Sequence, residues 1–289
     1  MGLVESVSAM NKSRMTGDWM AVASIEAVIL ARLVASTQTL GRMFRLGART
    51  TTIMLIDIVR GQLPIREAVI QAWFFITVTA VPAVLLAVPF GVVIAVQIGS
   101  ITKSVGASSM AGAVGGIGVM QQAAPMAAAL LVGGAGASAV SADLGARTIR
   151  DEIDAMRTMG IDPMRRLVSP RMLAMIVVAP MLSIIIILMS ILASFLVSVI
   201  AQGVASGSYW LSFGTFASTL DIVICVVKSM IFGYIVVIVA AQRGLEAKGG
   251  PRGVADGVNA AVVIGVVACF VVNVLITQLV SMFLPTRLF

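Results

Sequence analysis

The feature that most constrains this sequence is a series of continuously apolar runs, each about 20 residues or longer. A helix of that length crosses about 30 Å of hydrocarbon at 1.5 Å per residue. The runs lack the apolar and polar alternation of a membrane barrel, so the spans are predicted to be helices. With 59% hydrophobic residues, the fold class predicted is an all-α integral membrane protein. The five predicted spans are residues 73–99, 120–145, 172–202, 220–241 and 258–284.

The region before the first span is less hydrophobic and carries basic residues spaced among apolar ones. This pattern favours amphipathic helices that lie in the membrane interface with their cationic side chains near anionic headgroups. An alternative is a sixth span at residues 19–34, interrupted by Glu26. The predicted organisation is a tail at residues 1–18, interfacial helices at 19–68 and a five-span domain at 69–289.

The basic residues predict the orientation of the spans. Of the 20 Lys and Arg, eight lie at or before Arg66, six lie between the second and third spans, and three lie between the fourth and fifth. Because cytoplasmic loops carry the excess of basic residues, the N-terminus is predicted in the cytoplasm and the C-terminus outside. Residues 1–17 are polar and show no cleavable signal. This topology also explains the net charge of +7 without a nucleic-acid partner, since no basic cluster has interleaved aromatic residues.

The chain offers little of the usual chemistry of a catalytic site. It contains no histidine, and its two cysteines, Cys225 and Cys269, both lie inside apolar runs. Thiols in that setting act as small hydrophobic groups. No glycine-rich loop ends in the Lys-Ser/Thr pair of a phosphate loop. We therefore expect no enzyme, no bound metal or cofactor, and no ATP site on this chain.

A charged segment, RTIRDEIDAMRTMGIDPMRRLVSP, stands between the second and third spans at residues 147–170. Thr148 is predicted as an N-cap, with acidic residues in the first helical turn. Gly160 is suited to close the helix in the left-handed conformation, and Pro163 prevents its continuation. The sequence thus predicts a cytoplasmic helix at residues 149–159, within a segment 148–160.

This helix is predicted to be amphipathic, with a carboxylate inside its apolar stripe. The stripe consists of Ile149, Ile153, Met156 and Met159, with Glu152 set among them. On the opposite side Arg150 and Asp154 are four residues apart, close enough to pair. One interpretation is a helix that rests on the bilayer or on the base of its own protein. The other is a docking helix that inserts into a groove on a cytoplasmic partner.

The same residues resemble the signature of the MlaE/YrbE permease family, the membrane subunits of bacterial ABC-type lipid transporters. The stretch is DEIDAMRTMGIDPMRRLVSPR, preceded by SADLGARTI. Asp143 stands where the family usually has Glu, residues 151–156 match its E-Q-I-D-A-L block with substitutions, and Gly160 to Pro163 matches its G-x-x-P. The long N-terminal region and the Ala- and Val-rich composition are similar to the actinobacterial YrbE subunits.

The resemblance implies a coupling helix that seats on an ABC ATPase, where ATP and Mg²⁺ would bind. It also implies a second YrbE-type permease, as homodimer or heterodimer, an Mce-domain lipid-binding protein on the outer side, and a lipid or fatty acid as substrate. The location implied is the bacterial inner membrane. The ATPase-coupling residues implied are Asp151, Glu152, Ile153, Asp154, Ala155, Met156, Arg157, Gly160 and Pro163.

Three ionisable residues support an alternative from another class. Asp143 and Arg147 are four apart at the predicted cytoplasmic edge of the second span, as a structural ion pair or as a latch to the coupling helix. Asp221 opens the fourth span, and Lys228 lies about 10 Å deeper along it, too far for direct contact. Ionisable groups in spans are functional candidates. The alternative is an ion-coupled carrier that uses Asp143, Asp221 and Lys228 as a relay, and a scaffold without transport is a third reading.

Overall fold

The computed structural model describes residues 39, 41–61 and 64–283, and in those ranges every regular element is a helix. The chain divides into two units, Met1–Ala48 and Arg49–Phe289. Residues 41–59 are helical, and the division between the units falls inside this helix. The predicted tail at residues 1–18 and the alternative span at 19–34 lie outside the described residues.

Within the described residues, five helical stretches are long and apolar enough to cross a membrane, which confirms the five predicted spans. Each has a core of mean hydropathy of 1.6 or more. Each begins before its predicted apolar run, and the first, second and fourth also end after it, whereas the third ends at Ile200 instead of residue 202. The predicted end of the fifth at residue 284 lies outside the described residues. Backbone hydrogen bonding does not stop at the edge of the hydrocarbon, so helix ends are poorly marked by hydrophobicity. The stretches are α2 (Ile65–Ser104), Ala111–Ile149, Met164–Ile200, α9 (Thr219–Leu245) and α10 (Pro251–Phe283).

The second span is the most buried of the five, with 67% of its apolar core inside the protein. It changes helical type along its length because Pro125 lacks an amide hydrogen and leaves the carbonyl of Gln121 without an α-helical donor. A π-helical turn covers that point, as is common where a helix must absorb an irregularity. Its parts are α3 (Ala111–Gly118), η2 (Val119–Ala123), α4 (Ala124–Leu131), η3 (Val132–Gly136) and α5 (Ala137–Ile149).

The first and third spans pack closely through small side chains. In α2, Ala83, Ala87 and Gly91 are buried at four-residue intervals, a spacing that lets helix backbones approach. A Cβ on Gly91 would lie 2.9 Å from the carbonyl carbon of Ser190 in α7 (Ser169–Ile200). The Ser190 hydroxyl also donates to the carbonyl of Ala87 at 2.8 Å. The α2 and α7 pair is therefore fixed by backbone proximity rather than by large side chains.

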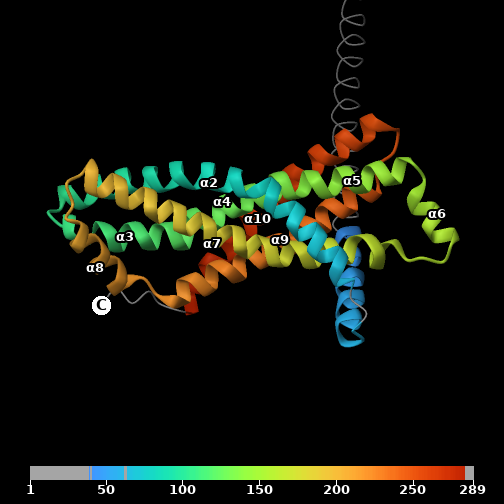
Figure 1. Ribbon diagram of the computed structural model, residues 1–289, viewed down its shortest axis with the longest axis horizontal. Coiled ribbons are helices and arrows are strands. Elements are labelled where there is room, and N and C mark those ends of the chain that lie inside the picture. Colours follow the sequence, from blue (N-terminus) through green and yellow to red (C-terminus); the bar gives the residue numbers. More distant parts are fainter. Residues whose placement is uncertain (1–38, 40, 62–63, 284–289) are drawn as a thin grey trace, which may run out of the picture. The chain divides into compact units, whose positions relative to one another are not determined.

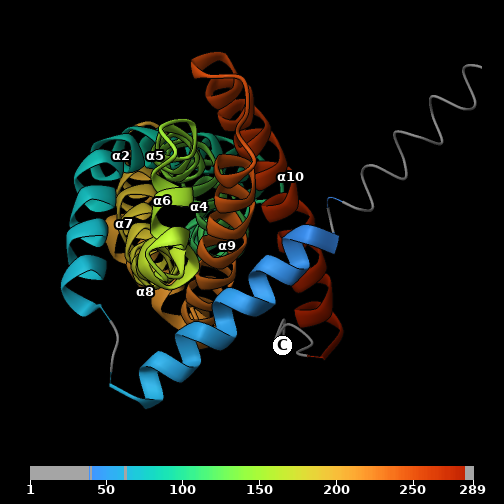
Figure 2. The ribbon, with the colours of Figure 1, turned by 90° about the vertical axis from the view of Figure 1, so that its right-hand side faces the viewer.

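Two short helices lie at opposite ends of the spans (Figure 1): α6 (Glu152–Thr158) follows α5, and α8 (Ser206–Phe216) follows α7. The aromatic residues of α8 hold it in place, with Tyr209 fully buried and its ring 5.3 Å from that of Phe195. The sequence analysis placed no helix there, because SGSYWLSFGTF is short and shows no clear period. In the view from the α6 end, α2 and α10 lie on opposite flanks with α9 between them (Figure 2).

Candidate functional site

The charged segment forms a helix, but it begins later than the sequence predicts. α5 continues through Thr148 to Ile149, so the prediction of Thr148 as N-cap is wrong. Its hydroxyl instead donates to the carbonyl of Leu144 at 2.8 Å and to that of Gly244 in α9 at 3.2 Å. The chain then turns at Asp151, whose φ of 57° is left-handed, and α6 starts at Glu152. Contact with α9 therefore extends α5 at the expense of the predicted cap.

The end of α6 follows the prediction. Gly160 has a φ of 77°, and its amide donates to the carbonyl of Arg157 at 3.0 Å. The Ile161 amide donates to the carbonyl of Met156 at 2.9 Å. These two bonds form a Schellman motif, in which only glycine takes the left-handed position without strain. The Asp162 side chain then accepts from the Met164 amide at 3.0 Å, which starts the next helical turn after Pro163.

The apolar stripe of α6 is only partly covered. Ile153 is buried, Met156 is half-buried, and Met159 is 66% exposed. The predicted pair of Arg150 with Asp154 is absent, because the turn at Asp151 breaks the helical register between them. Asp154 pairs instead with Arg157 at 2.8 Å, and Arg150 pairs with Glu152 at 3.0 Å. The exposed residues of α6 are Asp154, Ala155, Arg157 and Thr158, and Met159 at its C-cap is exposed as well.

An ion-pair network joins α5, α6 and α7 at this end of the spans. Asp143 accepts from the Nε of Arg147 at 3.2 Å, which confirms their i, i+4 ion pair, and it also pairs with the Nη2 of Arg171. Arg147 reaches on to Glu152 with an Nη1–Oε2 distance of 3.4 Å. Arg171 is buried, with its side chain 4% exposed, whereas that of Asp143 is 42% exposed. The network thus has one buried member, Arg171, and three half-exposed ones, Asp143, Arg147 and Glu152.

Residues before α2 anchor the connection between α6 and α7. The buried carboxylate of Asp57 holds Arg165 through two bonds, of 2.6 Å to Nη2 and 2.9 Å to Nε, a bidentate geometry with directional specificity. Arg49 pairs with Asp162 at 2.9 Å. Neither pair could be predicted from the sequence, because the members of each are more than 100 residues apart and no local pattern connects them.

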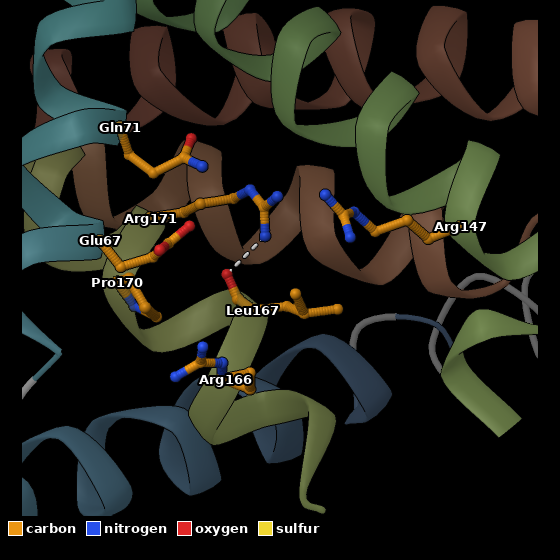
Figure 3. Close-up of a pocket in the computed structure, with 7 residues that line it drawn as sticks. All are labelled: Glu67, Gln71, Arg147, Arg166, Leu167, Pro170 and Arg171. Carbon is orange, nitrogen blue, oxygen red and sulfur yellow. Dashed lines mark hydrogen bonds between the residues drawn. The ribbon is translucent and has the colours of Figure 1, made fainter. Parts of the chain in front are cut away.

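Two adjoining cavities lie beside the network, between α2, α5 and α7. The first, of about 190 Å³, is lined by Glu67, Gln71, Arg147, Arg166, Leu167, Pro170 and Arg171. Figure 3 shows the side chains of Arg147 and Arg171 pointing toward one another. Glu67 and Gln71 of α2 lie at the left of the view, on the side of Arg171 away from Arg147. The second cavity, of about 510 Å³, is mostly apolar and is lined by Ile70, Gln71, Phe74, Phe75, Ala139, Val140, Ala142, Asp143, Arg147 and Arg171.

A second polar cluster lies within the spans around Lys228, which is 2% exposed. Its ammonium donates to the hydroxyl of Thr277 in α10 at 2.8 Å and to the carbonyl of Gln121 at 3.4 Å. That carbonyl is the one left without a helical donor by Pro125. The side-chain Nε2 of Gln121 donates to the Oδ1 of Asp221 at 3.0 Å. Gln121 therefore stands between Asp221 and Lys228, in agreement with the prediction that these two do not meet.

The three residues of the suggested relay fall into two separate groups. Asp221 and Lys228 are connected through Gln121, whereas Asp143 belongs to the ion-pair network at the α6 end. Among residues 64–283, no hydrogen bond or ion pair joins the two groups. A proline four residues after a polar residue within an apolar run is the signal that would have revealed Gln121. The sequence predicts Arg171 only as one of the basic residues of a cytoplasmic loop. Its pairing with Asp143 joins two different spans, which no local pattern reports.

Comparison with known proteins places these groups inside a recognised region. Residues 68–279 match the Permease MlaE family, a range that runs from α2 to α10 and includes α6. A probable ABC transporter permease protein of Rickettsia felis is 27% identical over 73% of this chain and 82% of its own length. One of Synechocystis is 26% identical over 65% and 72%. The Arabidopsis protein TRIGALACTOSYLDIACYLGLYCEROL 1, chloroplastic, is 27% identical over 55% and 45%.

Proposed function

The chain belongs to the MlaE permease family, and from this premise we propose that it forms, with a second permease subunit, the transmembrane path of an ABC-type lipid transporter. It is a multi-pass membrane protein, and its relatives include probable ABC transporter permeases. The proposal adds the substrate, a lipid or fatty acid, together with the partners and the site residues. The Arabidopsis relative carries the name of a galactolipid, which supports a lipid substrate.

The single observation that carries the lipid proposal is a buried cation among almost wholly apolar spans. Lys228 has a hydroxyl and a backbone carbonyl as hydrogen-bond partners and no carboxylate in direct contact among the described residues. A charged group at membrane depth is costly and marks functional sites by default. The surrounding helices offer many aliphatic side chains, which suit hydrocarbon tails. An amphiphile with an anionic or strongly polar headgroup satisfies both features.

We assign the driving force to a separate ABC ATPase that binds ATP and Mg²⁺. The exposed face of α6 would dock on it, with Asp151 to Arg157, Gly160 and Pro163 as the coupling segment. The network of Asp143, Arg147, Glu152 and Arg171 connects α6 to α5 and α7, so a displacement of α6 would be passed to the spans. We therefore propose that the α6 end and the N-terminus face the cytoplasm across a bacterial inner membrane, with an Mce-domain protein on the outer side.

The test is lipid transfer by the assembled complex. The tagged chain is purified from its native membrane with the proteins that stay bound, and reconstituted in vesicles with a fluorescent phospholipid or fatty acid. We expect an ATPase to co-purify, ATP to drive lipid movement, and Lys228→Met to slow it about tenfold or more. Lys103→Met is the matched control, since Lys103 is exposed at the end of α2.

Two results would overturn the proposal. Lipid movement by the isolated chain under an ion gradient, without any ATPase, would instead establish the carrier, for which the Lys228, Gln121 and Asp221 contacts offer a short polar path. Equal transport by wild type and Lys228→Met would remove the buried lysine from the substrate path.

A further inference from the structure

The two cavities beside the ion-pair network form one amphipathic site. They share three lining residues, Gln71, Arg147 and Arg171, so they adjoin along the edge where α2 faces α5 and α7. The smaller is lined mainly by charged and polar side chains. The larger is lined mainly by apolar ones, and its volume of about 510 Å³ lies within the range of known ligand sites. A single ligand that fills both needs a polar head and an apolar tail.

The charge at the polar end is positive. Three arginines, Arg147, Arg166 and Arg171, face two carboxylates, Glu67 and Asp143, across the two cavities. Asp143 already pairs with Arg147 and Arg171, and Glu152 pairs with Arg147 and Arg150, so this end holds four arginines against three carboxylates. Arg166 forms no ion pair among the described residues and its side chain is exposed. A guanidinium presents five N–H donors in a planar fork that suits phosphate oxygens. The surplus positive charge at this end therefore fits an anionic headgroup.

The apolar end is positioned to meet the membrane. On α2, Trp73 is 69% exposed and Phe74 is 49% exposed, as is typical of aromatic residues near a headgroup boundary. Ile70 and Phe74 line the larger cavity from α2, and Ala142 lines it from α5 with its small side chain exposed. A hydrocarbon chain that enters from the bilayer can lie along this groove without displacing any large side chain.

We propose that this site holds one anionic phospholipid from the leaflet at the α6 end, with its phosphate on Arg166 and Arg147 and an acyl chain along the groove between α2 and α5. The lipid is a resident ligand of the permease rather than its cargo, so the inference goes beyond the transport function and does not depend on it. A purely apolar partner helix would fill the groove but would leave the arginine surplus unmatched. The charge complementarity thus selects the phospholipid.

The experiment measures lipid retention by native mass spectrometry. The full chain, with whichever partners co-purify, is exchanged from nanodiscs of phosphatidylglycerol and phosphatidylcholine into detergent, and bound lipids are counted. We expect one retained phosphatidylglycerol per chain, and about tenfold weaker retention in Arg166→Gln, because a charge-assisted hydrogen bond is lost. Arg252→Gln is the matched control, because Arg252 is exposed at the start of α10 and lines neither cavity.

A second variant tests the contribution of the apolar groove independently of the arginines that would hold the headgroup. Ala142→Phe fills the groove from an exposed position and leaves every arginine in place, so we expect it to weaken retention as well, without loss of folding. Equal retention of phosphatidylcholine would overturn the proposal, as would unchanged retention in Arg166→Gln or in Ala142→Phe. Displacement of the lipid by millimolar inorganic phosphate alone would show an anion site without a lipid, and would overturn it too.

Discussion

Removal of the Asp143 carboxylate should destabilise the fold by leaving the buried Arg171 without its paired carboxylate. The Arg171 side chain is 4% exposed, and its other hydrogen bond reaches only the carbonyl of Leu167, at 2.6 Å. Loss of one partner of a fully buried pair costs about 3–5 kcal/mol. Because Asp143 is 42% exposed and water reaches that side, we expect about 2–4 kcal/mol of lost unfolding free energy for Asp143→Asn.

The assay is thermal unfolding in nanodiscs, followed by tryptophan fluorescence. At roughly 2–4 °C per kcal/mol for a chain of this size, the Tm should fall by roughly 4–16 °C. Asp154→Asn provides the control. Its pair with Arg157 has side chains 70% and 60% exposed, so its loss should cost less than about 1 kcal/mol.

A double-mutant cycle decides whether the effect comes from this pair. Arg171→Met removes the buried charge, and the double variant Asp143→Asn with Arg171→Met should recover part of the stability lost by Asp143→Asn, since neither charge remains. Strict additivity of the two changes, within about 0.5 kcal/mol, would refute the reasoning. So would a Tm for Asp143→Asn equal to that of the control.

Three further results are expected. Gly91→Ala should cost about 1–3 kcal/mol in the same unfolding assay, because its Cβ would press on the Ser190 backbone, whereas Gly134→Ala, with open space around it, should cost almost nothing. Asp154→Lys should abolish lipid-coupled ATP hydrolysis in vesicles while the Tm and membrane insertion stay unchanged, and full coupling would remove α6 from the ATPase contact. Burial raises the pKa of the Tyr209 phenol above its ordinary value of about 10. The unfolded phenol therefore loses its proton at lower pH, so unfolding free energy should fall as pH rises through about 10, and Tyr209→Phe should reduce that fall in Tm measured against pH.

The spans were predictable because each is a long apolar run, and hydrocarbon thickness sets the length of such a run. The short α8 was not, because its aromatic residues find their partners on α7, with Tyr209 against Phe195, and no local period reports that. The π-helical turn at Gln121 was only partly predictable. Its cause, Pro125, is visible in the sequence, but the use of the freed carbonyl by Lys228 depends on α9.

The candidate site divides in the same way. The end of α6 was predictable because Gly160 and Pro163 act through the backbone of their own neighbours. The start was not, because Thr148 bonds to Gly244, 96 residues away, and tertiary support overrode the local cap. The pair of Asp143 and Arg147 was visible as an i, i+4 spacing. The pairing of Asp143 with Arg171 was not visible in the sequence, because an ion pair between two spans depends on how the helices pack.

The strengths of the ion pairs determine where this end of the permease can bend. Glu152 is held by Arg147 and Arg150 at 3.4 and 3.0 Å, with its side chain 38% exposed; such pairs contribute about 1 kcal/mol or less and separate readily. The pair of Asp143 with Arg171 separates at a higher cost, because the Arg171 side chain is only 4% exposed and would lose its carboxylate away from water. A force on α6 should therefore open the turn at Asp151 before it parts α5 from α7. The two substitutions should therefore have different effects. Asp154→Lys should abolish coupling to ATP hydrolysis while the helical bundle stays folded, whereas Asp143→Asn should lower the stability of the bundle itself.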